Sequence, residues 1–161
     1  MNTWLIDLIW STNGRPFTED EAERIASYAE TLPERLLAVQ KLEESQKWLV
    51  KNLNDIVGPK AAEWGLPKEP FTQDFAQSLS ALAHAVLSDD MNVLERNVIQ
   101  PMKDLADALD IPSEELGNIF VTAWDLLKRR LDPKHASWLE PYFLRAAENL
   151  NATQLQFAGM V

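Results

Sequence analysis

Cysteine is absent from this chain of 161 residues. Its absence excludes disulfides, cysteine nucleophiles, thiolate zinc and iron–sulfur sites, and every cofactor that is attached through a thioether bond. The five glycines form no glycine-rich phosphate loop, and no serine lies in a Gly-x-Ser-x-Gly turn. Hydrolases, kinases and dinucleotide-binding enzymes are therefore excluded. No catalytic residue is predicted, and we expect the chain not to be an enzyme.

Histidine is scarce as well, with two residues, His84 and His135. Neither is followed by an acidic residue three or four positions later, so the sequence predicts no metal site on a helix. His84 shares a polar helix face with Gln77 and Ser80, and His135 follows a turn, so we expect both to face solvent. A histidine that faces solvent cannot be the axial ligand of a buried haem, and haem is not expected.

Positive charge is in deficit, because 15 basic residues stand against 25 acidic ones and the formal net charge is −10. This excess of negative charge opposes attraction to nucleic acid and to anionic membrane surfaces. The N-terminal apolar stretch, Trp4 to Trp10, is too short to cross a membrane and has no basic leader. We expect a cytoplasmic protein that binds no nucleic acid and does not insert into membranes.

The rest of the sequence predicts an all-α domain, because apolar residues recur at intervals of three and four and no β-hairpin signal appears. A capping box, Thr18 to Glu21, predicts a helix that begins near residue 19 and ends before Pro33. A second capping box, Thr31 to Glu34, predicts a long helix that Gly58-Pro59 stops. The other expected segments are a loop at 58–70, a helix at 71–88 with Phe71, Phe75, Leu79, Leu82 and Val86 on its apolar stripe, a helical stretch at 92–110 that Pro101 breaks near Gln100, helices at 114–131 and 138–150, and a tail at 151–161.

The N-terminal stretch carries two tryptophans, Trp4 and Trp10, whose spacing of six residues places them on different sides of a helix. One of them therefore meets something outside its own helix. Two interpretations stay open: both rings pack on the core of the domain, or the stretch forms a subunit interface, where tryptophan is a favoured anchor. The candidate interface residues are Trp4, Leu5, Leu8, Ile9 and Trp10.

The order of these signals resembles the phycobiliproteins, the globin-fold antenna subunits of cyanobacteria. The resemblance is carried by Gly14-Arg15 before a capped helix, by the long helix that follows, and by the run from Leu94 to Ser113 (LERNVIQPMKDLADALDIPS). It implies a globin-like, phycocyanin-like domain of about seven helices at 14–150, preceded by an N-terminal docking helix at 1–13. It also implies phycobilisome subunits as partners, a homodimer or heterodimer built by N-terminal helices, and a place on the cytoplasmic face of thylakoids.

The pigment-attachment element of that family is altered in this chain. In the family, a Cys-x-Arg-Asp element holds an open-chain tetrapyrrole: the cysteine forms the thioether, the arginine binds a propionate, and the aspartate hydrogen-bonds the pyrrole nitrogens. Here the matching residues are Phe71, Thr72, Gln73 and Asp74. Phe71 cannot form the thioether, and Gln73 lacks the cationic fork that suits a carboxylate. A covalent bilin is therefore excluded, and no cofactor is predicted.

Two functions stay open. The first is a bilin-free accessory, scaffold or regulatory subunit of the light-harvesting system that acts through protein–protein contacts. The alternative is a sensor or carrier module that holds a noncovalent tetrapyrrole or a fatty-acid-like ligand between the helices at 71–88 and 94–110. The residues expected to line that site are Trp64, Phe71, Asp74 and Phe75.

Overall fold

The computed structural model describes residues 2–158, and for 68–70 and 152–158 it describes the backbone alone. Every regular element in that part of the chain is helical, which confirms the all-α prediction. The helices are α1 (Thr3–Thr12), α2 (Glu19–Glu63), α3 (Lys68–Ser88), α4 (Met91–Leu94), α5 (Gln100–Ala108), α6 (Ser113–Leu127) and α7 (Pro133–Ala158), and a π-helical segment, η1 (Glu95–Ile99), joins α4 to α5.

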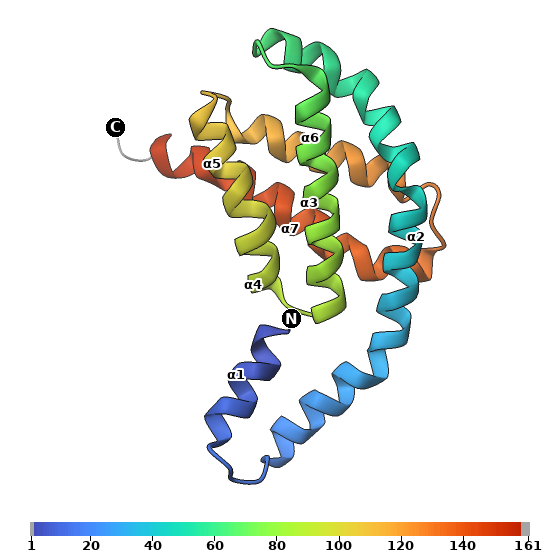
Figure 1. Ribbon diagram of the computed structural model, residues 1–161, viewed down its shortest axis with the longest axis vertical. Coiled ribbons are helices and arrows are strands. Elements are labelled where there is room, and N and C mark those ends of the chain that lie inside the picture. Colours follow the sequence, from blue (N-terminus) through green and yellow to red (C-terminus); the bar gives the residue numbers. More distant parts are fainter. Residues whose placement is uncertain (1, 159–161) are drawn as a thin grey trace.

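The helices form a bundle from which one arm projects (Figure 1). Helices α6 and α7 lie against each other in the bundle, and both contact α2, which also packs along α3. The arm consists of α1 and the first part of α2, joined by a turn at the end far from the bundle (Figure 1). Helix α1 ends at Thr12, and the division of the chain into 1–13, 14–150 and 151–161 stays a prediction.

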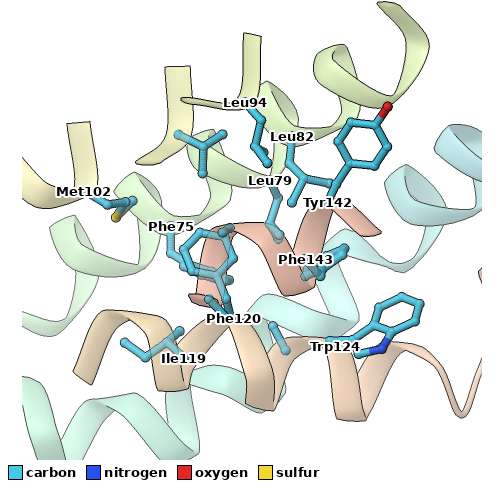
Figure 2. Close-up of a cluster of buried hydrophobic side chains, with 14 of the residues drawn as sticks. Phe75, Leu79, Leu82, Leu94, Met102, Ile119, Phe120, Trp124, Tyr142 and Phe143 are labelled. Atoms are coloured by element: carbon cyan, nitrogen blue, oxygen red, sulfur yellow. The ribbon is translucent and has the colours of Figure 1, made fainter. Parts of the chain in front are cut away.

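The core lies where α3 meets α6 and α7 (Figure 2). Phe75 packs against Phe120 with ring centroids 5.2 Å apart, and Trp124 packs against Phe143 at 5.3 Å. Each buried side chain of this size contributes about 1.5–3 kcal/mol through the hydrophobic effect. The predicted apolar stripe of α3 is confirmed, because its members are all buried: Phe71, Phe75, Leu79, Leu82 and Val86. The buried face of α6 consists of Leu116, Ile119, Phe120, Ala123 and Leu127.

Helix α2 begins at the predicted capping box and then runs through Pro33, where the sequence predicts an end. The second capping box is wrong, because the Thr31 hydroxyl donates to the backbone carbonyl of Ser27 at 3.1 Å, as it does inside a helix. Pro33 itself is exposed, so water can satisfy the carbonyl that its ring leaves unpaired. An interior proline costs about 3 kcal/mol, and burial of the apolar residues that follow offsets that cost: Ala38, Val39 and Leu42.

Helix α2 also continues through Gly58-Pro59, where a second end is predicted. The predicted end is wrong. Val57 and Ala61, on either side of Gly58-Pro59, are both buried, and an unbroken helix places both side chains in the core. The long loop expected at 58–70 shrinks to the four residues 64–67. This short turn brings α3 back along α2.

Pro101 does not break the helical run that contains it, which extends from Met91 to Ala108. In the segment η1 just before the proline, the Gln100 N–H donates to the Glu95 carbonyl, five residues earlier. Such a π-turn shifts the register of the carbonyls, which is one way in which a helix accommodates a residue that lacks an N–H. Helix α5 begins at Gln100, as predicted. The chain passes from α4 to α5 through a π-turn, however, and not through the predicted break.

The last two helices differ from prediction at their ends. Helix α6 stops at Leu127 instead of 131, and α7 begins at Pro133 instead of 138. The Asp132 carboxylate accepts a hydrogen bond from the Lys134 N–H at 2.8 Å and so satisfies a free donor at the start of α7. The backbone of α7 is helical to Ala158, well into the predicted tail, whose residues 159–161 lie outside the described part of the chain.

The contact between α6 and α7 depends on Gly117. A Cβ atom at this position would lie 3.0 Å from the carbonyl oxygen of Ala147 and even closer to the Asn151 side chain. We predict that Gly117→Ala lowers the free energy of unfolding by about 1–3 kcal/mol, because the helices must separate. At an unobstructed helix interior the same change raises that free energy by about 0.5–1 kcal/mol, so the sign is diagnostic in urea unfolding followed by circular dichroism.

The double variant Gly117→Ala/Asn151→Ala is the control for this prediction. It removes the closest obstacle but keeps the Ala147 carbonyl, so it should recover part of the loss. Stabilisation by Gly117→Ala alone would show that the two helices are not in close contact there.

Candidate functional site

Helix α3 separates the residues that are predicted to line one ligand site. Phe71 and Phe75 are buried in the core, where Phe75 points toward Phe120 (Figure 2). Trp64 packs edge-on against Phe71 with ring centroids 5.9 Å apart. Asp74 is exposed and lies on a different side of α3. The structure therefore separates Asp74 from the three aromatic rings, which lie in the core or pack against it, and a ligand site at these residues stays a prediction.

A groove of about 390 Å³ does lie at the predicted place, between α3 and the η1–α5 segment. Its α3 wall consists of residues three and four positions apart, which share one helix face. Asp74 is the one predicted residue that lines it. The other lining residues, which the sequence analysis did not single out, are Gln77, Ser78 and Ala81 on α3 and Asn97, Val98, Pro101, Met102 and Leu105 opposite them.

The groove offers a ligand one carboxylate and a largely apolar wall. Asp74 is the charged residue among the described residues of its lining, and none of those residues is Lys or Arg. The Ser78 hydroxyl already donates to the Phe75 carbonyl at 2.7 Å. The arrangement suits an apolar ring or chain that carries an N–H donor for Asp74. Helical spacing is the sequence signal that could have separated the groove wall from the core, because Asp74 and Phe75 lie about 100° apart around α3 and face different sides.

The first turn of α1 is attached to the junction between α3 and α4. The side chains of Asn2 and Trp4 both donate to the Ser88 carbonyl, through Nδ2 at 2.8 Å and Nε1 at 3.1 Å. The Thr3 hydroxyl donates to the carboxylate of Asp90, which also accepts from an N–H in the first turn of α4. The arm is therefore held to the bundle by polar contacts at one end of α1.

The other end of α1 is uncovered. Trp4 packs edge-on against Tyr28 of α2 at 5.5 Å and lies under the Arg24 guanidinium at 4.2 Å, whereas Trp10 is 79% exposed. The two tryptophans thus face different surroundings, as their spacing predicts. Of the five predicted interface residues, Trp4, Leu5 and Leu8 are half-buried, and Ile9 and Trp10 are exposed.

A second hollow, of about 360 Å³, lies where the start of α1 meets α2 and α3. Its apolar lining includes Tyr28, Leu32, Leu36 and Leu87, and Leu32 and Leu36 are exposed. His84 stands at its edge and is exposed, as predicted. An apolar surface therefore lies beside the arm, and no described part of the chain covers it.

The turn between α1 and α2 is held by charge. The Arg15 guanidinium donates to both carboxylate oxygens of Glu21, at 2.7 and 2.8 Å, and the Thr18 N–H donates to the same carboxylate at 2.8 Å. The hydrogen bonds from Arg15, and after them that from Thr18, lower the pKa of Glu21 to about 2. The group lies at the surface, so it adds little stability, but it keeps the turn in one geometry at neutral pH.

The end of α3 is held by an ion pair between a buried arginine and a half-exposed carboxylate. Arg35 of α2 is 5% exposed, and its guanidinium lies 2.7 Å from the Asp89 carboxylate. The Tyr142 hydroxyl of α7 donates to the same carboxylate at 3.4 Å, and burial, followed by the charge of Asp89, raises the pKa of Tyr142. Sequence reasoning missed this cluster. Its signal was the spacing of three residues between Arg35 and Ala38, which places the arginine on the same helix face as the buried alanine.

Two other kinds of site are absent from the described residues. No group of three His, Cys, Asp or Glu side chains there is placed to hold a metal ion. None of the helices in the same part of the chain has the length and apolar character needed to cross a membrane. The arm and the groove are therefore the two candidate sites.

Comparison with known proteins agrees with the helical order. The profile of a family described as "Phycobilisome protein" matches residues 10–150. The chain has no significant match among curated proteins. The all-helical architecture is consistent with the globin-like fold of that family, which confirms the predicted fold class.

Asp90 makes the attachment of the arm depend on pH. Burial raises the pKa of its carboxyl, but hydrogen bonds from the Thr3 hydroxyl and the Asn92 N–H lower it by more, so the net shift is downward. The stabilisation is therefore complete above the unfolded-state pKa of about 3.9 and is lost as the pH falls through the folded-state value. We predict that Asp90→Ala lowers the free energy of unfolding by about 1–2 kcal/mol at pH ~7, and by less below pH ~4.

Urea unfolding at neutral and acid pH measures both effects. Asp90→Ser is the matched control, because a hydroxyl still accepts from the Asn92 N–H at the helix start but carries no charge. This variant should lose less stability than Asp90→Ala. A deficit of Asp90→Ala that is equal at both pH values would argue against a role of the charge.

Proposed function

Because the chain belongs to the phycobilisome protein family, we propose that it serves light harvesting as a pigment-free accessory, scaffold or regulatory subunit. It acts by binding other proteins and catalyses no reaction. The family match supports a role in the phycobilisome and assembly with its subunits. The pigment-free character is proposed from this chain's own residues.

The residues on α3 support the absence of a covalent pigment. Phe71, at the attachment position of the resembled element, is buried in the core. Gln73 does not line the groove, so no side chain there takes the place of the family's arginine. Asp74 alone is both the same residue type as in the resembled element and part of the groove wall.

The uncovered apolar surface of the arm is the observation that carries the proposal. Trp10 is 79% exposed and Ile9 is 52% exposed on a helix whose other end is fixed to the bundle. Exposed tryptophan on a fixed element is typical of the anchor residues that dominate protein interfaces. The hollow beside Leu32 and Leu36, at the start of α1, is a second apolar surface that could receive an apolar side chain of the partner.

The partner that we propose is a second chain with the phycobilisome-protein fold, identical in a homodimer or different in a heterodimer. Its own N-terminal arm would supply the complementary apolar face. Association of this kind places the protein in the cytoplasm, at the phycobilisomes on the cytoplasmic face of thylakoids. The absence of a membrane-spanning helix among the described residues is compatible with this location.

Trp10→Ala tests the arm as the interface. Truncation of an interface tryptophan costs about 2–4 kcal/mol, so we expect the dissociation constant to rise by about 30- to 1000-fold. The measurement is sedimentation velocity of the purified chain, alone and mixed with subunits released from phycobilisomes.

Leu144→Ala is the control, because Leu144 is an exposed apolar residue on α7, away from the arm. It should leave the association unchanged. A chain that stays monomeric and binds no phycobilisome subunit, or an equal loss in both variants, would rule out the arm as the interface.

The groove supports a second candidate function, that of a carrier or sensor of a noncovalent ligand. Its volume of about 390 Å³ is within the range of small-molecule sites. Asp74 at its wall could accept a hydrogen bond from a pyrrole N–H. A bilin, or a fatty-acid-like chain lying along the Val98 and Met102 side, is the proposed ligand.

Absorption spectra of the protein expressed with and without a supply of biliverdin test this candidate, and palmitic acid tests the apolar ligand class. We expect Asp74→Asn to weaken bilin binding about tenfold or more, whereas Asp107→Asn, an exposed carboxylate that does not line the groove, should not. Absence of a visible band together with absence of palmitic acid binding would dismiss the carrier function.

A further inference from the structure

The turn between α1 and α2, at the end of the arm far from the bundle, contains the dipeptide Asn13-Gly14 (Figure 1). No other asparagine in the sequence is followed by glycine. Both residues are exposed, and both have left-handed backbone conformations, with φ of 47° at Asn13 and 83° at Gly14. Asparagine and glycine tolerate this region, which is unfavourable for most other residues. The turn therefore places a side-chain carboxamide next to a backbone nitrogen that no Cβ atom shields.

The reactive groups of this dipeptide are unprotected. Among the described residues, the Asn13 side chain has no hydrogen-bond partner, and the Gly14 N–H donates to none of them. The neighbouring amides are engaged instead: the Asn13 N–H donates to the Trp10 carbonyl at 3.2 Å, and the Arg15 N–H donates to the Thr12 carbonyl at 3.0 Å. Apart from its chain neighbours, no atom lies within 4 Å of the place where Gly14 would carry a Cβ atom. The Gly14 nitrogen is therefore open to attack the carboxamide beside it.

We propose that Asn13 is a self-modification site, at which the chain loses ammonia and takes up water. The Gly14 nitrogen attacks the Asn13 Cγ atom: a new N–Cγ bond forms, the Cγ–Nδ2 bond breaks, and the amide nitrogen leaves as ammonia with the Gly14 proton. Water then adds to one of the two carbonyl carbons of the succinimide ring. Cleavage of the N–Cγ bond yields aspartate. Cleavage of the original peptide bond yields isoaspartate, whose main chain runs through the former side chain.

The attack needs a rotation that the folded turn restrains. At the Asn13 ψ of 40°, the Gly14 nitrogen points away from the Cβ atom, and the succinimide ring requires the two to lie on the same side. Both α1 and α2 are attached to the bundle, so a rotation at Asn13 must be compensated within residues 14–17. Arg15 resists that movement, because its guanidinium donates to both carboxylate oxygens of Glu21 at 2.7 and 2.8 Å. The ion pair thus controls how often the reactive geometry is reached.

Both products change the arm at the point where α1 ends. A carboxylate at position 13 adds negative charge beside the last carbonyls of α1, where the helix dipole is already negative, and so weakens the last turn. Isoaspartate adds one carbon atom to the main chain and changes the direction in which the chain leaves α1. Ile9 and Trp10 lie on that last turn, so the exposed apolar surface is the part that the products alter. An effect on assembly rests on the proposed function of that surface, whereas the modification itself does not.

Intact mass and peptide mapping of the purified full-length chain test the site after incubation at neutral pH and physiological temperature. The peptide that contains Asn13 should gain the mass difference between an amide and a carboxyl group, and fragmentation by electron transfer should identify isoaspartate among the products. Asn118, which is exposed but lies within α6 and precedes Ile119, is the internal reference. We expect Asn13 to convert at least about tenfold faster, because Asn118 reacts only when α6 opens locally.

Three variants separate the chemistry from the restraint. Asn13→Gly keeps a residue that tolerates the left-handed conformation and removes the carboxamide, so the mass of this peptide should stay unchanged. Glu21→Gln keeps an acceptor for the capping box but loses the ion pair with Arg15. It should speed the conversion of Asn13 about two- to fivefold, which is the value of a surface ion pair. The matched control is Glu23→Gln, because Glu23 is exposed and forms no ion pair among the described residues, and it should leave the rate unchanged.

Two results would overturn the proposed site: an Asn13 that stays unchanged over the incubation, and equal conversion of Asn13 and Asn118. An unchanged rate in Glu21→Gln would overturn the restraint by Arg15. Sedimentation velocity of Asn13→Asp beside the unmodified chain tests the effect on assembly, which weaker association supports and equal association overturns. A chain that associates in neither form would count against the proposed function and not against the modification site.

Discussion

The buried guanidinium of Arg35 is the constraint on which the arrangement of this molecule depends. Its ion pair with Asp89, at 2.7 Å, joins α2 to the end of α3, and Tyr142 adds α7 to the same carboxylate. Asp89 is half exposed, so the pair itself adds little net stability, but a buried cation without its partner costs about 3–5 kcal/mol. The pair thus holds the end of α3, where Asp89 takes a left-handed conformation at φ 50°. The next residue, Asp90, faces the arm and accepts from Thr3.

This junction explains why the arm can be both fixed and uncovered. Core and arm meet at residues 88–90, where the hydrogen bonds to Ser88 and Asp90 hold the first turn of α1. Beyond that turn α1 has little support, so Trp10 is presented to solvent on a helix of defined direction. A member of the phycobilisome protein family thus presents an apolar surface on a fixed arm. The groove lies elsewhere on the bundle, between α3 and the η1–α5 segment, so the two surfaces can be tested separately.

Local sequence patterns predict most of the helices in this chain. The helix ends that they predict wrongly have one cause. The capping box from Thr18 to Glu21 and the buried stripe of α3 act through nearest neighbours, and both are confirmed. Pro33 and Pro59 also act locally, but the buried residues that follow each of them gain more from an unbroken α2 than the prolines cost. At Pro101 the conflict is relieved by a π-turn, which no local rule predicted. Burial against distant helices, which the sequence does not display, therefore decided where helices end.

The order and the composition of the residues are enough to establish the helical class and to exclude a pigment attached through a cysteine thioether. Both follow from residue identity, since periodicity shows in the order of residues and a thioether bond needs a cysteine that the chain lacks. Only the tertiary structure decided which face of α3 is core and which is groove, and it separated Phe71 from Asp74. It alone brought Arg130 over the ring of Trp48, and it alone gave Arg35 its partner. These contacts join residues far apart in the chain, and their energies depend on burial and distance, which are properties of the folded molecule.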